Sequence, residues 1–150
     1  METEEAKNAY SAFTGFDFRP GQREAVEYCY KSTKPVTILR APVGSGKTLV
    51  GLTLGEMHDK FAYLCSSKQL QDQIKQDHGS DIALLMGRSN YPCNLSTNTM
   101  SAAQCINTQS DPCPDLGRCH YRRQKARVAE SRRQVLNYPY MLAEFNYIGA

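Results

Sequence analysis

The chain has no long apolar run, no basic leader and few large aliphatic side chains. None of its 150 residues belongs to a stretch approaching the ~20 apolar residues that span a bilayer. The first five residues are acidic overall, where a signal peptide would be basic. Leu, Ile, Val and Phe number only 28, a proportion that favours disorder when the net charge is also high. Because the net charge is only +3, we expect a folded cytoplasmic protein with a thin core and no membrane contact.

Large aliphatic residues are scarcest between residues 86 and 120. Only Leu95, Ile106 and Leu116 in this segment belong to the Leu, Ile, Val and Phe set. Such a segment cannot fold around a core of its own and needs a disulfide or a bound metal group to stabilise it. Four of the six cysteines lie there, and no two of them form the C-x2–4-C pair that is typical of zinc sites. They are Cys93, Cys105, Cys113 and Cys119.

Three chemistries compete for these cysteines. Structural disulfides need an oxidising compartment, and the sequence shows no export signal. Structural zinc normally uses closely paired ligands, which are missing. An iron–sulfur cluster tolerates wide and irregular spacing because each thiolate binds a separate iron. Spacing favours the cluster but leaves the three chemistries open. His120 beside Cys119 could substitute as a ligand, although a surface histidine is the favoured interpretation. The other two cysteines, Cys29 and Cys65, lie in apolar contexts and are predicted to be packing residues.

Positive charge is concentrated in residues 118–133. This window contains seven Lys and Arg residues and one acidic residue, Glu130. Its net charge is therefore +6, and that of the rest of the chain is −3. A local field of this kind can hold a polyanion, although a solvated helix face has the same composition. The seven cations are Arg118, Arg122, Arg123, Lys125, Arg127, Arg132 and Arg133.

Apolar periodicity and turn residues predict alternating helices and strands after a polar tail over residues 1–15. Ser66 and Gln69 form a capping box that begins a helix with Leu70 and Ile74 directed inward. Strands that alternate with helices pair in parallel, so the predicted fold class is α/β. Helices are expected over 20–32, 46–59, 66–78, 121–135 and part of 137–148, and strands over 36–39, 61–65 and 82–85.

A phosphate-loop motif follows the first predicted strand. Residues 41–48 match the pattern G-x-x-x-x-G-K-[ST] except at the first position, which is Ala. Gly44 and Gly46 let consecutive N–H groups curve around an anion at the start of a helix. Lys47 is expected to reach the β- and γ-phosphates of ATP, and the Thr48 hydroxyl to ligate Mg²⁺, so both are candidate catalytic residues. The predicted nucleotide-binding residues here are Ala41, Pro42, Val43, Gly44, Ser45, Gly46, Lys47 and Thr48.

The order of these segments resembles that of the XPD/DinG-type iron–sulfur DNA helicases of superfamily 2, over about residues 16 to 150. Phe-Arg-Pro-Gly-Gln at 18–22 looks like the family's adenine-reading Q motif, and residues 64–73 look like motif Ia. Val-Leu-Asn-Tyr at 135–138, followed by Met141-Leu142, is similar to the segment that re-enters the motor domain. The most specific match is Gly-Arg-Ser-Asn-Tyr-Pro-Cys at 87–93, followed by three further cysteines.

The resemblance implies an ATP-dependent helicase that translocates 5′ to 3′ on single-stranded or forked DNA, in repair or replication, in the nucleoid or nucleus. It implies a RecA-like parallel sheet with a [4Fe–4S] insertion, whose ligands are Cys93, Cys105, Cys113 and Cys119. It places Arg19 and Gln22 at the nucleotide, with the Gln22 amide on the adenine edge. Tyr91 or Tyr121 could stack a base, but packing against the cluster loop is the favoured role for either ring. The implied nucleic-acid contacts are Ser67, Lys68, Gln69, Arg88, Tyr91, Arg118, Arg122, Arg123, Lys125 and Arg127.

The motif order divides the chain into four expected parts. These are a tail (1–15), the first part of a motor domain (16–86), the cluster insertion (87–120), and a basic helix returning to the motor domain (121–150). The family's Asp-Glu-Ala-His box is missing, since the chain contains no Asp-Glu dipeptide, and so is a second motor domain.

We therefore expect the N-terminal portion of a larger helicase, or the product of a truncated or split gene, with the remainder as its partner. Such a chain should bind nucleotide weakly and turn over little by itself. One alternative is a cluster- or zinc-stapled nucleic-acid-binding module with a vestigial phosphate loop. Another is a small P-loop kinase, which would leave the cysteine segment unexplained.

Overall fold

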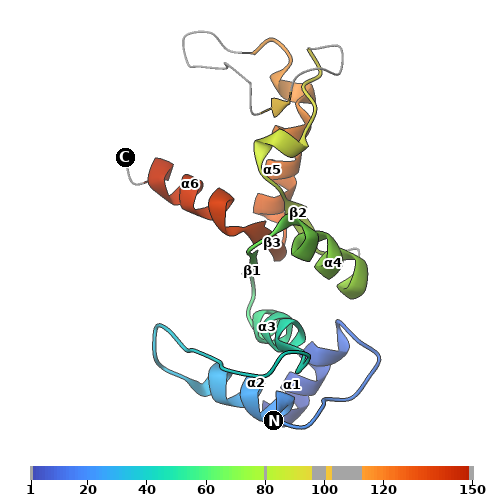
Figure 1. Cartoon of the computed structure of the whole chain (residues 1–150), viewed down its shortest axis with the longest axis vertical. Coiled ribbons are helices and arrows are strands. Elements are labelled where there is room, and N and C mark those ends of the chain that lie inside the picture. Colours follow the sequence, from blue (N-terminus) through green and yellow to red (C-terminus); the bar gives the residue numbers. More distant parts are fainter. Residues whose placement is uncertain (1, 80, 96–100, 103–112, 149–150) are drawn as a thin grey trace.

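The computed structural model describes residues 2–79, 81–95, 101–102 and 113–148. They form an elongated α/β protein with three helices at one end and a small sheet in the middle (Figure 1). The elements are, in order, α1 (Glu2–Ser11), α2 (Gln22–Lys31), α3 (Lys47–Glu56), β1 (Phe61–Cys65), α4 (Lys68–His78), β2 (Ala83–Leu85), η1 (Arg88–Asn90), η3 (Leu116–Arg118), α5 (His120–Glu130), β3 (Arg133–Asn137) and α6 (Tyr138–Ile148).

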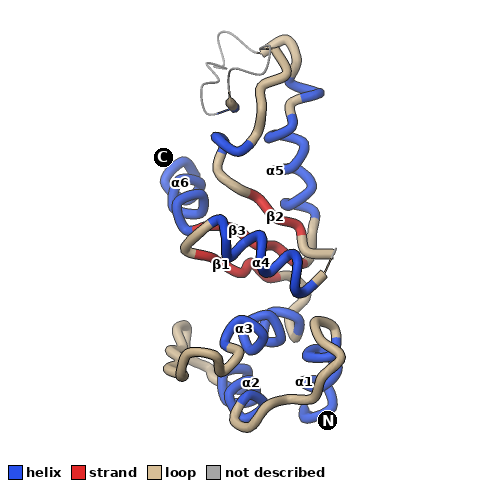
Figure 2. Tube along the Cα trace, turned by 45° about the vertical axis from the view of Figure 1, so that its right-hand side comes forward, coloured by secondary structure: helices blue, strands red, loops and turns tan. Residues whose placement is uncertain are grey.

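The sheet has three parallel strands in the order β1-β3-β2 (Figure 2). The register pairs Cys65 of β1 with Asn137 of β3, and Leu85 of β2 with Leu136. Because the strands are parallel, all three end at the same side of the sheet, which we call the carboxyl edge. The predicted α/β class with parallel pairing is confirmed at this level.

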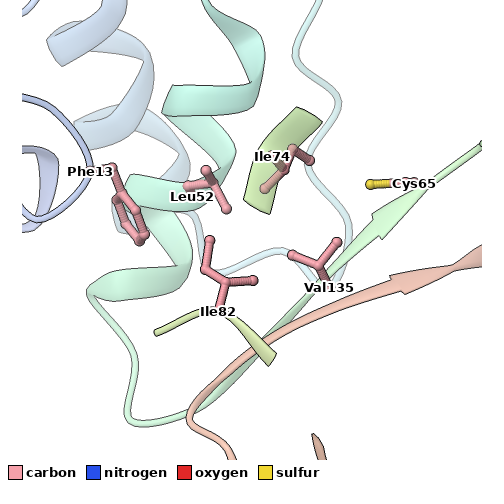
Figure 3. Packing of buried hydrophobic residues seen from close by; sticks show 6 residues of the cluster. All are labelled: Phe13, Leu52, Cys65, Ile74, Ile82 and Val135. Carbon is pink, nitrogen blue, oxygen red and sulfur yellow. The ribbon is translucent and has the colours of Figure 1, made fainter. Parts of the chain in front are cut away.

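Consecutive residues of β3 are buried on opposite faces of the sheet, as the two-residue period of a strand requires. Val135 packs with residues of α3 and α4 on one face (Figure 3). Leu136 packs with α5 on the other face. The first cluster contains Phe13, Leu52, Cys65, Ile74, Ile82 and Val135. The second contains Ala83, Leu85, Ala102, Tyr121, Val128 and Leu136. Cys65 is a packing residue, as predicted, and Cys29 is half-buried.

The prediction of a polar tail over residues 1–15 is wrong, because most of this segment is α1. Ala6, Ala9, Tyr10 and Phe13 are buried, and α1 packs against α2 and α3. These residues follow the i, i+3, i+4, i+7 spacing of an amphipathic helix. The small alanine side chains hid that stripe among the surrounding charged residues.

The strand predicted over residues 36–39 is not formed. Val36 is 73% and Ile38 89% exposed, and the segment has no regular structure. A β-branched run becomes a strand only where a neighbouring strand offers its edge. Among the described residues, no strand pairs with this run.

The helix predicted to continue to residue 135 ends at Glu130, and the chain then enters β3. Val135 and Leu136 would lie on one side of a continuing helix, but in β3 each fills a different core. The missed strand is the central one of the sheet.

The start of α4 differs from the prediction by one residue. Ser67, not Ser66, caps the helix, with its hydroxyl accepting a hydrogen bond from the Leu70 amide. The prediction that Leu70 points inward is wrong, because Leu70 is 42% exposed. Gln71 is buried instead, and its Nε2 donates to the carbonyl of Leu85 at 2.9 Å. Ile74 is buried, as predicted.

Candidate functional site

The phosphate-loop motif forms a glycine-dependent turn that leads directly into α3. Gly44 and Gly46 have φ angles of 80° and 79°, in the left-handed region that favours glycine. Lys47, the first residue of α3, folds its ammonium group back onto the loop and donates to the carbonyls of Ala41 (3.1 Å) and Pro42 (2.6 Å). The loop thus places a cation and a helix N-terminus together, the combination that attracts phosphate.

The Q-motif segment holds this loop in place. Gln22 is 4% exposed, and its Nε2 donates to the carbonyl of Ser45 at 2.9 Å. Its Oε1 accepts hydrogen bonds from the Tyr10 hydroxyl (3.0 Å) and the Arg19 amide (2.9 Å). The Arg19 guanidinium donates to the carbonyl of Gly44 at 3.3 Å. Gln22 therefore braces the loop through its side-chain amide, and both Oε1 lone pairs are already used within the protein.

A cavity of about 540 Å³ lies between the Q-motif segment and the start of α3. Arg19 and Gln22 line it from one side, and Gly46 and Thr48 from the other. Tyr10 of α1 also lines it, a residue that the prediction of a polar tail left out of the site. The apolar stripe of α1 was the signal that could have found it.

Thr48 has a neighbour that the sequence did not indicate. Burial raises the pKa of Tyr63, and the nearby Thr48 hydroxyl partly offsets this rise. Gly51 brings the aromatic ring close to α3, since a Cβ there would lie 2.8 Å from Cε2 of Tyr63. Tyr63 on β1 thus contacts the helix that carries the candidate magnesium ligand.

Three of the four predicted cluster ligands line one cavity. Cys93, Cys113 and Cys119 lie around a space of about 470 Å³, whereas Cys105 lies outside the described residues. In the described part of the chain, no group of three or more His, Cys, Asp or Glu side chains is arranged to hold one metal ion. The three cysteines therefore share one cavity without converging on a single ion position in the part of the chain that the structure describes.

The loops that carry these thiols are tied to one another. Asn94, next to Cys93, donates through Nδ2 to the carbonyl of Arg118 at 2.6 Å. Arg118 Nε bonds Oδ1 of Asp115 at 2.6 Å, and the Cys119 carbonyl accepts from the Arg123 amide as α5 begins. The cavity also has three cationic neighbours, Arg88, Arg122 and Lys125. Cationic walls would stabilise a group with net negative charge.

The basic window divides into two parts with different roles. Arg132 and Arg133 both bind the Glu56 carboxylate at the end of α3, with 2.8 Å from Arg133 Nε to Oε2. Arg132 also donates to the carbonyls of Glu56, His58 and Asp59. These two arginines join α3 to β3, a structural role that the sequence analysis did not foresee.

The remaining cations of the window lie on or just before α5. Buried Tyr121 and Val128 fix this helix on the sheet, and Gln124 donates to the carbonyl of Leu84 at 2.7 Å. The opposite face is exposed, and none of its arginines pairs with a described carboxylate. These arginines are Arg122, Arg123 and Arg127.

The motif Ia segment (residues 64–73) continues from the end of β1 at the carboxyl edge of the sheet. The Gly-Arg-Ser-Asn-Tyr-Pro-Cys segment (residues 87–93) follows β2 at the same edge. Lys68 Nζ donates to Asn90 Oδ1 at 2.7 Å, which links the two segments. Gln69 is exposed. Tyr91 packs its ring against Tyr121, with centroids 5.6 Å apart, and its hydroxyl accepts from the Met86 amide. Tyr91 and Tyr121 thus pack against each other, in line with the packing role that the sequence favours for either ring.

No protein-family model, curated protein or solved structure matches this chain. Among the residues that the structure describes, none of the helices is both long and apolar enough to cross a bilayer.

Proposed function

We propose that this chain is the ATP-binding N-terminal portion of an ATP-dependent, XPD/DinG-type iron–sulfur helicase acting on single-stranded DNA. The observation that carries the proposal is the gathering of Cys93, Cys113 and Cys119 around one cavity beside the arginines of α5. These thiols are separated in sequence by up to 26 positions, and they line one cavity of the structure.

Cys93, Cys113 and Cys119, together with Cys105, would hold a [4Fe–4S] cluster. When bound, the cluster supplies a covalent staple for a segment with almost no apolar residues of its own. Arg88, Arg122 and Lys125 offset its negative charge. The exposed arginines of α5 then bind DNA phosphates without reading sequence.

The nucleotide half of the proposal is supported by the bonds from Gln22 to Ser45 and from Arg19 to Gly44. ATP phosphates would displace the Ala41 and Pro42 carbonyls from Lys47, and Mg²⁺ would bind the Thr48 hydroxyl. The proposed role in repair or replication and the 5′-to-3′ polarity rest on the resemblance alone.

Metal analysis tests the cluster. Anaerobically purified protein should be brown and contain iron and acid-labile sulfide, with about four irons per chain as expected for a [4Fe–4S] centre. A colourless protein with one equivalent of zinc would overturn the assignment.

Nucleotide titration tests the phosphate loop. Lys47→Ala should weaken binding of a fluorescent ATP analogue with Mg²⁺ by about tenfold, as expected for one charge-assisted bond. Lys34→Ala is the matched control, because Lys34 is an exposed lysine outside the motif. Equal binding by the wild type and the Lys47 variant would contradict the ATP-binding role.

A second candidate function is a metal-stapled nucleic-acid-binding module with a vestigial phosphate loop. The exposed, unpaired run at residues 36–39, in front of the loop, favours it. DNA binding without any Mg–nucleotide binding would select this module over the motor.

A further inference from the structure

The cavity between the Q-motif segment and the phosphate loop is lined by residues of α1, α2 and α3, which pack together at one end of the molecule (Figure 2). Each helix contributes a polar side chain to it, Tyr10, Gln22 and Thr48 in turn. Because Thr48 belongs to the phosphate loop, a nucleotide held there by its phosphates would place its base among the other lining residues. What those residues offer to a base decides which nucleotides the site can take.

Gln22 has the groups that could read adenine, but its hydrogen bonds are made within the protein. A glutamine reads adenine by accepting from the N6 amino group through Oε1 and donating to N7 through Nε2. Both acceptor sites of Oε1 are used, by the Tyr10 hydroxyl at 3.0 Å and the Arg19 amide at 2.9 Å. Nε2 donates to the Ser45 carbonyl at 2.9 Å, and Gln22 is 4% exposed. Reading adenine would therefore break at least one of these internal bonds.

The orientation of the Gln22 amide is fixed by its neighbours. Turning the amide over would set its NH2 group against the Arg19 N–H, which cannot accept a hydrogen bond. It would also set Oε1 against the Ser45 carbonyl, which cannot donate one. Tyr10 is itself held in place, since its ring packs on Phe18 with centroids 4.0 Å apart. The amide is thus fixed as a brace for the loop.

The other polar side chains of the cavity offer a base no firmly held partner. His78 and Arg19 each contact a main-chain carbonyl at 3.3 Å. The Thr14 hydroxyl accepts from the Phe16 amide, also at 3.3 Å. Asp17 is exposed, so water competes for its carboxylate oxygens and a hydrogen bond from a base would add little affinity.

We propose that this site binds nucleoside triphosphates as a class, without preference among the bases, because Gln22 positions the phosphate loop instead of reading adenine. Tyr10 is then a second positioning residue: its hydroxyl holds Gln22, and Gln22 holds Ser45 in the loop. The proposal rests on the nucleotide binding proposed above, and it makes the substrate class wider than ATP.

Competition against a fluorescent ATP analogue, with Mg²⁺ present, tests the base preference. The four competitors are ATP, GTP, CTP and UTP, and the protein is the whole 150-residue chain. We expect their four affinities to agree within the roughly fivefold that one hydrogen bond contributes. A larger preference for ATP would overturn the inference.

Two variants test the positioning role. Tyr10→Phe removes the hydroxyl that holds Gln22 but keeps the ring on Phe18, and Gln22→Ala removes the amide itself. Each should weaken the binding of all four nucleotides by the same factor, roughly fivefold for one lost hydrogen bond. Tyr28→Phe is the matched control, because Tyr28 is 75% exposed on α2, outside the cavity. Thermal melting of each variant shows whether it is folded.

The outcomes separate this inference from the proposed function. If the wild type prefers ATP and the folded Gln22→Ala protein loses that preference, Gln22 reads adenine, and the inference is wrong while nucleotide binding stands. A preference that Asp17→Asn removes places base selection at that carboxylate and also overturns the inference. Equal nucleotide binding by the wild type and both folded variants would refute the positioning role. A wild type that binds no nucleotide overturns both the inference and the proposed ATP-binding function. The wild-type comparison decides the base preference even where a variant does not fold.

Discussion

The side-chain Nε2 of Gln22 donates a hydrogen bond to the main-chain carbonyl of Ser45 at 2.9 Å, across 23 positions of sequence. The same nitrogen lies 2.3 Å from the place where a Cβ at Gly46 would be. The phosphate loop and the Q-motif segment are therefore fitted to each other closely enough to leave no room for a methyl group.

Gly46→Ala should destabilise the protein for two reasons. The φ of 79° costs about 1–2 kcal/mol for an alanine, and the new methyl group forces Gln22 away from Ser45, which removes a hydrogen bond worth about 1 kcal/mol. Urea unfolding measures the sum. Gly44→Ala is the control, because it has the same backbone strain, with a φ of 80°, but open space around its Cβ. Equal losses from the two variants would show that Gln22 does not hold the loop.

Glu56→Gln should lower the free energy of unfolding by about 2–3 kcal/mol near neutral pH, since it weakens charge-assisted bonds to two arginines. Asp81→Asn should change it by less than about 0.5 kcal/mol, because that carboxylate is 83% exposed and 3.8 Å from Arg133. Chemical denaturation of the three proteins gives the comparison.

The contribution of Glu56 should also depend on pH. Burial by itself raises the pKa of Glu56, but hydrogen bonds from Arg133 and Arg132 outweigh it and hold the pKa below its usual value. A carboxyl group whose pKa is lowered in the folded state adds stability above its unfolded pKa, about 4.3, and loses it as the pH falls through the folded value. The difference between wild type and Glu56→Gln should therefore be complete near pH 6 and shrink below about pH 4. A difference that stays constant down to pH 3 would contradict the ion pair.

Cys93→Ser, Cys113→Ser and Cys119→Ser should each lower the iron content and the visible absorbance of the purified protein. Cys29→Ser should leave both unchanged, because Cys29 lies on α2, away from the cysteine cavity. Cys65→Ala should reduce stability by a few kcal/mol at most while leaving iron unchanged, since Cys65 packs in the core beneath the sheet. Iron loss in the Cys29 variant that matches the loss in the Cys93 variant would refute this assignment.

Arg123→Gln and Arg127→Gln should weaken single-stranded DNA binding and flatten its salt dependence by about 0.7 in the log–log slope for each phosphate that is no longer neutralised. Arg132→Gln should reduce stability but leave that slope unchanged, because Arg132 is bound to α3. Fluorescence anisotropy at several salt concentrations measures the slopes. If Arg132→Gln flattens the slope as much as the α5 variants do, the division of the basic window is wrong.

Several elements were predictable because their signals are local. The apolar run at 61–65 and the run at 82–85 became β1 and β2, apart from one end residue. The two glycines of the phosphate loop adopt the positive φ angles that the motif requires. The N-terminal helix is also encoded locally, by the apolar spacing of Ala6, Ala9, Tyr10 and Phe13.

The sequence by itself determined the turn glycines, the concentration of cysteines in a segment poor in apolar residues, and the clustering of positive charge. Only the tertiary structure decided which apolar runs became strands, since strand formation depends on a partner edge contributed by distant residues. This is why residues 36–39 remain exposed while Arg133–Asn137 became the central strand. Tertiary structure also decides which arginines of the basic window form ion pairs. Glu56 binds Arg132 and Arg133. No described carboxylate pairs with the α5 arginines, which are Arg122, Arg123 and Arg127. What a side chain does here depends on what the fold places opposite it.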